Sequence, residues 1–178
     1  MKINNLIQNN YNNKSASPLK TNSNINFNSI LNEKEQLESA EEIGHCHYLD
    51  PIDIELRIYR INNTDEPLYK VNTLKDGKLT QTQIINPKDI DMKSASSEEL
   101  FAMNSYLYDK KLVTGDFSIV DSEIMAEYHP EKQNALEIGS QWANMQLSAN
   151  NMESYLLHKK LIDILYHLDS LSSLHKKE

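Results

Sequence analysis

The sequence predicts an α+β fold in which a three-stranded antiparallel meander is followed by a helical bundle. Apolar and charged residues alternate from Ile52 to Ile58, which is the period of a half-buried strand. An Asp76-Gly77 pair lies between two further strand-like segments, and this pair is a strong hairpin signal. From Ser96 onward the apolar residues recur at helical spacing. The length of 178 residues fits one compact domain with a tail.

The first 32 residues differ from the rest of the chain in composition. They hold eleven asparagines, three lysines and no acid, so they carry a charge of +3. The remainder carries 15 basic and 26 acidic residues, a charge of −11. Asparagine favours turns over helix or strand, and the few apolar residues cannot offset the entropy lost on ordering. We therefore expect residues 1–32 to form a disordered leader and residues 33–178 a single domain.

The first elements of this domain follow from local signals. Residues 33–44 are rich in glutamate and end at Gly44, which predicts a short surface helix. The meander is expected within residues 52–85, and Asn86-Pro87 ends its last strand. A small sheet is marginal alone, so helices are expected to cover its apolar face.

The helical bundle is expected over residues 96–174. Ser96 and Glu99 have the spacing of a capping box, which predicts that the first helix begins there. The later helices are expected over residues 120–128, from Pro130 to 147, and from Asn150 or Asn151 to Leu174.

One candidate surface for binding a partner is a row of small residues. Ala135, Gly139 and Ala143 lie four residues apart on the helix that contains Trp142. A glycine inside a helix costs about 1 kcal/mol relative to alanine, so close approach of another backbone would explain it. That backbone belongs either to this chain or to a partner helix.

A second candidate surface lies on the last helix. Leu157, Leu161, Ile164 and Leu168 repeat at 4-3-4 spacing, which is typical of a helix-packing seam. Packing within the bundle is the ordinary explanation, and a side left exposed would receive a helix of a partner protein.

His45, Cys46 and His47 are the only cluster of candidate metal ligands, and a weak one. Imidazole and thiolate bind zinc, but neighbouring side chains point in different directions. We therefore expect a half-buried loop here, with no metal and no cofactor. His129 and Glu127 lie two residues apart and would not face each other on a helix, so a catalytic pair is not expected.

Composition excludes several further classes. No nucleophile or phosphate-loop motif is present, so we expect no enzymatic activity. A net charge of −8 argues against a binder of duplex nucleic acid. The longest apolar stretches fall far short of the roughly 20 residues needed to span a bilayer. The two apolar helix surfaces described above lead us to expect a protein partner.

The acid-poor leader, the predicted strands and the helical bundle without a catalytic motif resemble small flagellum-associated proteins. The plan is similar in particular to that of a co-chaperone that acts with the flagellin export chaperone. This resemblance implies a non-catalytic protein of the bacterial cytoplasm that binds an export chaperone or a flagellar component. The alternative is an effector or a surface structural protein that uses residues 1–32 as a signal for flagellar or type III export.

Overall fold

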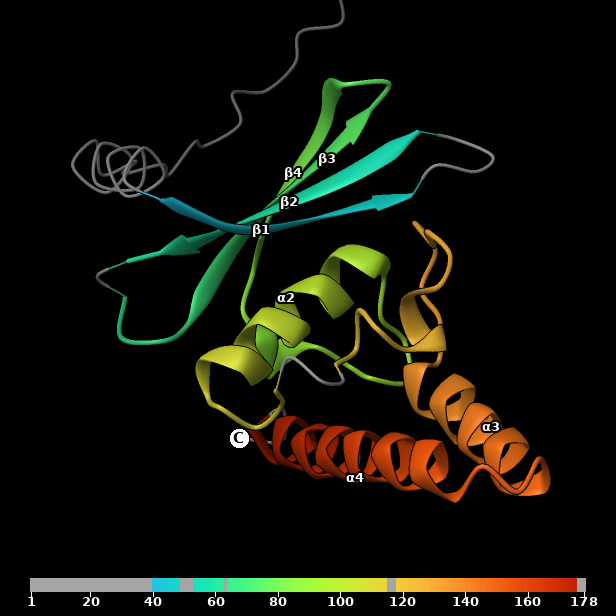
Figure 1. The fold of residues 1–178 in the computed structure, drawn as a ribbon. Coiled ribbons are helices and arrows are strands. Elements are labelled where there is room, and N and C mark those ends of the chain that lie inside the picture. Colours follow the sequence, from blue (N-terminus) through green and yellow to red (C-terminus); the bar gives the residue numbers. More distant parts are fainter. Residues whose placement is uncertain (1–39, 49–52, 63, 115–117, 176–178) are drawn as a thin grey trace, which may run out of the picture.

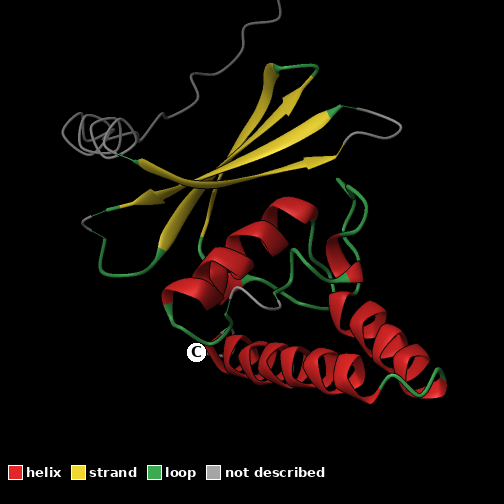
Figure 2. Cartoon of the chain, in the orientation of Figure 1, coloured by secondary structure: helices red, strands yellow, loops and turns green. Residues whose placement is uncertain are grey.

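The computed structural model describes residues 40–48, 53–62, 64–114 and 118–175, of which the last five as backbone only. One antiparallel sheet forms one layer, and all described helices lie on the same side of it (Figures 1 and 2). The predicted α+β class is confirmed, but the sheet has four strands in the order β1-β2-β3-β4, one more than predicted. The predicted leader lies outside the described residues.

The additional strand is β1 (Glu41–Tyr48), which pairs antiparallel with β2 (Ile54–Ile61). The prediction of a helix up to residue 44 is therefore wrong for the described part of that segment, and Gly44 lies at a bulge within the strand. Pairing with β2 overrides the helical preference of the glutamates, since it places Cys46 and Tyr48 opposite Leu56 and Ile54.

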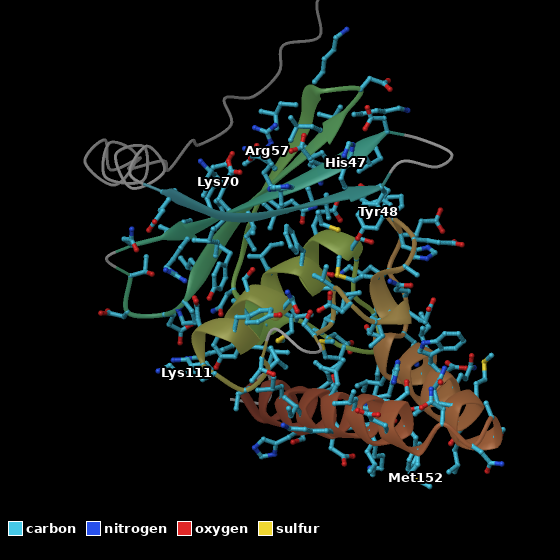
Figure 3. The ribbon with its side chains drawn as sticks, in the orientation of Figure 1. His47, Tyr48, Arg57, Lys70, Lys111 and Met152 are labelled. Carbon is cyan, nitrogen blue, oxygen red and sulfur yellow. The ribbon has the colours of Figure 1, made fainter. Side chains whose placement is uncertain are left out.

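The remaining strands, β3 (Leu68–Lys75) and β4 (Lys78–Ile85), were predicted. Asp76 and Gly77 join them with positive φ angles of 50° and 71°, as a tight hairpin turn requires. One face of the sheet buries apolar side chains of β2 and β3, whereas the other stays open. Figure 3 shows His47, Arg57 and Lys70 on this open face and Tyr48 on the opposite side.

Helix α2 (Ser97–Asp109) covers the apolar face of the sheet. Its capping box is formed as predicted, because Ser96 accepts from the Glu99 amide and Glu99 accepts from the Ser96 amide. Leu100, Phe101 and their neighbours on this helix are buried against the strands. A short 3₁₀ turn, η1 (Pro87–Asp89), connects the sheet to this part of the chain.

The segment after α2 differs from the prediction. The helix expected over residues 120–128 is wrong, since only the 3₁₀ turn η2 (Glu123–Met125) forms there. Helix α3 (Ala135–Ser148) begins five residues later than predicted, because Gln133 is held extended by backbone bonds to Ala95 and Asn134 caps the helix. Helix α4 (Met152–His175) follows Asn151, which accepts from the Ser154 amide.

Candidate protein-binding groove

Helices α3 and α4 pack as a hairpin through the predicted row of small residues. A Cβ atom on Gly139 would lie 3.0 Å from Ile162 Cγ1 on α4 and 3.1 Å from Ile124 Cδ1. Ala135 and Ala143 are buried in the same way. Side chains of the same chain therefore occupy the position beside Gly139, and of the predicted set on α3 only Trp142 is half-buried.

The predicted seam on α4 lies along an apolar groove. Leu161 forms its buried floor, Ile164 and Leu168 are half-buried, and Leu157 is 39% exposed. The groove consists of two adjoining hollows of about 220 and 570 Å³. We call this surface the α4 groove, and its apolar lining is Leu112, Val113, Leu156, Leu157, Leu161, Ile164 and Leu168.

Leu112 reaches the groove from the chain that leaves α2. The Lys111 amide donates to the Tyr108 carbonyl and the Leu112 amide to the Leu107 carbonyl, both at 2.9 Å. These two bonds, together with a φ of 56° at Lys111, form a Schellman motif. Glycine usually occupies the position that Lys111 holds, so the motif forms here at the cost of a left-handed lysine.

The α4 groove has a basic rim in an acidic protein. Lys159 and Lys160 line its wider hollow together with Asp163, and Lys110 and Lys111 precede Leu112 in sequence. Lys159 forms an ion pair with Asp163, one turn further along α4. Figure 3 labels Lys111 at the end of α2, and Met152 at the start of α4.

His45, Cys46 and His47 do not converge on one point. They lie in strand β1 instead of the predicted loop, so the two imidazoles point to the open face and the thiol points inward. His47 Nε2 lies 2.5 Å from Asp53 Oδ1. Burial raises the pKa of the Cys46 thiol, which opposes the thiolate that a metal requires. The described residues contain no group of three potential metal ligands.

Glu98 is a buried acid that the sequence did not single out. It lies in the first turn of α2, where acids are normally solvated, yet it is only 1% exposed. Its carboxylate accepts hydrogen bonds from Thr73 Oγ1 at 3.0 Å and from the Tyr128 hydroxyl at 2.7 Å. The Tyr128 ring packs against Tyr48 with centroids 5.7 Å apart. These contacts attach the segment before α3 to the sheet.

His129 and Glu127 lie near each other at the surface, in the irregular segment before α3. The His129 Nε2 lies 4.0 Å from the Glu127 carboxylate, and both side chains are solvent-accessible. The backbone of His129 instead exchanges two hydrogen bonds with Ser97. The residue therefore helps to fix the chain beside the start of α2.

The fold and groove define an α+β protein with an exposed apolar surface on its helical layer. No family model, curated protein or solved structure matches the chain. Among the described helices, none combines the length and apolar character needed to cross a bilayer.

Proposed function

We propose that the protein is a non-catalytic binding module that holds an amphipathic helix of a partner protein in the α4 groove. The observation that carries this proposal is the exposure of Leu112, Leu156 and Leu157 along one surface, at 41%, 57% and 39%. Helix-in-groove recognition uses apolar anchors of this kind on a preformed surface. Contiguous exposed apolar residues on a small protein are also typical of interaction sites.

The rim chemistry supports an acidic partner helix. Lys159 and Lys160 stand beside the apolar lining, although the protein as a whole carries −8. Acidic residues that flank the apolar face of a helix would meet these lysines while its apolar anchors contact Leu156 and Ile164. Complementary charge of this kind raises association rates and fixes the orientation of the bound helix.

We further propose that this partner belongs to the flagellar or type III export system of a bacterium. The support is the asparagine-rich, acid-poor segment 1–32 followed by a small α+β body, which resembles a co-chaperone of the flagellin export chaperone. In this role the protein acts in the cytoplasm and binds an export chaperone or a flagellar component.

Site-specific photo-cross-linking in a flagellated host tests this proposal. Benzoylphenylalanine in place of Leu156 reports on the groove, and the same group in place of Gln141, exposed on α3, is the control. The expected result is an adduct at position 156 only, with a flagellar or export protein at an acidic amphipathic helix. Equal labelling at both positions would contradict the groove, and adducts that lack any flagellar component would contradict the assignment to export.

The leader supports a second candidate function, that of an exported effector or surface protein. Deletion of residues 1–32 separates the two candidates. Export of the full chain, lost on deletion while partner binding persists, favours the exported protein. A full chain that stays in the cytoplasm and binds its partner equally well with and without the leader favours the co-chaperone.

A further inference from the structure

Strand β4 is an exposed edge of the sheet. Within the described residues it pairs only with β3, and six of its eight residues are exposed. Its sequence from Leu79 to Ile85 contains no charge and no proline. An edge strand presents unpaired N–H and C=O groups, and proteins usually protect such edges with charges, proline or bulges. Lys78 and a register shift near Leu79 are the only such devices on β4, both at one end.

The opposite edge of the sheet is protected. Strand β1 begins with Glu41 and Glu42 and contains a bulge between Glu42 and Gly44. Its exposed side chains include His45 and His47. The contrast between the two edges indicates that β4 is the one suited to pair with another strand.

Two apolar side chains of β4 are exposed to solvent. Leu79 is 59% and Ile84 is 48% exposed, and the four residues between them are threonines and glutamines. Ile84 lies opposite Lys70 and Leu79 opposite Leu74 on β3, so both belong to the open face. A neighbouring strand would cover part of this apolar surface.

The two ends of β4 differ in charge, because the start has Lys75 and Lys78 against Asp76, and the end has Asp65, Glu66 and Asp89 against Lys88. Lys78 stands at the start of the strand, and Asn86 at its end donates a hydrogen bond to the Glu66 carboxylate at 2.6 Å. Asp65 and Asp89 are close to Glu66 and Asn86 in sequence. Lys88 is the base of this region, and it forms an ion pair with Glu66. An antiparallel pair of two β4 strands centred on Thr82 sets Lys78 of each copy opposite Asn86 of the other, beside the acidic end.

We propose that two copies of the chain dimerise by antiparallel pairing of their β4 strands. A twofold axis at Thr82 repeats every favourable contact, as in other isologous interfaces. The result is one continuous sheet made of two four-stranded halves. Helix α2 separates α4 from the sheet (Figure 1), so this pairing leaves both α4 grooves open. The dimer is thus independent of the proposed function.

Charge substitutions at Thr82 test the interface. Thr82 is exposed, and its hydroxyl donates a hydrogen bond to Asn72 Oδ1 at 2.9 Å on the neighbouring strand, so Thr82→Lys and Thr82→Glu are compatible with the fold. In the dimer, each places two like charges opposite one another, which is destabilising in a sheet. The control is Asn144→Lys, the same charge change at an exposed position of α3. Light scattering after size exclusion gives the mass, and circular dichroism confirms folding.

The expected result is a dimer for the wild type and for Asn144→Lys, and a monomer for each Thr82 variant alone. An equimolar mixture of Thr82→Lys and Thr82→Glu is expected to restore the dimer, because opposite charges then face each other. A monomeric wild type, or a dimer that both Thr82 variants retain, would overturn the proposal. So would a mixture that stays monomeric, since a correctly placed pair must be rescued.

Discussion

The hydroxyl of Tyr128 donates a hydrogen bond to the buried carboxylate of Glu98 at 2.7 Å. This bond joins the irregular segment before α3 to the first turn of α2, and Thr73 on β3 completes the arrangement. One acid thereby links three parts of the chain that are distant in sequence.

Replacing Tyr128 with phenylalanine is expected to lower the free energy of unfolding by about 1.5–3 kcal/mol, the range for a hydrogen bond to a charged group. The change leaves a buried carboxylate with one donor fewer. Urea unfolding measures the effect. Tyr108→Phe is the matched control, because that hydroxyl is in an exposed setting, and an equal loss in both variants would contradict the role of Glu98.

The same tyrosine makes stability depend on pH in the alkaline range. Burial, and then the Glu98 carboxylate, raises the pKa of Tyr128, and burial likewise raises the pKa of Tyr48 and Tyr69. Above about pH 10 an unfolded tyrosine loses its proton while the folded one keeps it. The free energy of unfolding is therefore expected to fall as the pH rises above about 10. Urea unfolding from pH 8 to 11 should show a shallower decline for Tyr128→Phe than for wild type.

Replacing Lys111 with glycine is expected to stabilise the protein by about 0.5–1 kcal/mol, since glycine adopts a positive φ without steric cost. Lys110 has a φ of −84°, so Lys110→Gly is expected to be neutral or destabilising. Thermal or urea unfolding compares the two. A stabilisation that is equal in both variants would show that charge, and not backbone conformation, is responsible.

Gly139→Val tests the crossing of α3 and α4. The added side chain would meet Ile162 and Ile124, both buried, and the expected loss is about 1–3 kcal/mol from overpacking. Asn144→Val, on the exposed side of the same helix, controls for the lower helix propensity of valine. Similar losses in the two variants would mean that the helices do not approach closely at Gly139.

Truncation of the buried Leu161 and of the exposed Leu156 in the α4 groove should change the free energy of unfolding by different amounts. Leu161 is 2% exposed, so Leu161→Ala is expected to cost about 2–5 kcal/mol. Leu156 is mostly exposed, and Leu156→Ala is expected to change stability by less than about 0.5 kcal/mol. Urea unfolding of both variants checks this. A large loss for Leu156→Ala would show that this side chain is already covered by the protein.

The elements whose conformation depends on neighbouring residues were predicted correctly from the sequence. The alternation in β2, the Asp76-Gly77 turn and the capping box at Ser96 each depend on a few neighbouring residues, and all three were predicted. Strand β1 was missed because its glutamates favour helix and only its pairing with β2 selects the strand. The segment around η2 was missed for a similar reason, since it is held by distant partners such as Glu98 and Asn104.

The groove was predictable only in part. The spacing of Leu157, Leu161, Ile164 and Leu168 identified one wall of it from sequence. The opposite wall is Leu112, some 45 residues earlier in the chain, and no periodicity links the two. A lysine in a left-handed conformation at position 111 also carries no local signal, because glycine or asparagine is the residue normally expected there.

The position of β1 has a mechanical consequence. The chain ahead of Glu41 joins the sheet at an edge strand that, within the described residues, forms backbone pairs only with β2. A force that draws Glu41 away from the sheet therefore acts on the β1–β2 pairs in succession, beginning with Glu41 and Arg60, instead of shearing them all together. Unzipping of this kind requires little force. Removal of β1 would also expose the ring of Tyr128, which packs against Tyr48.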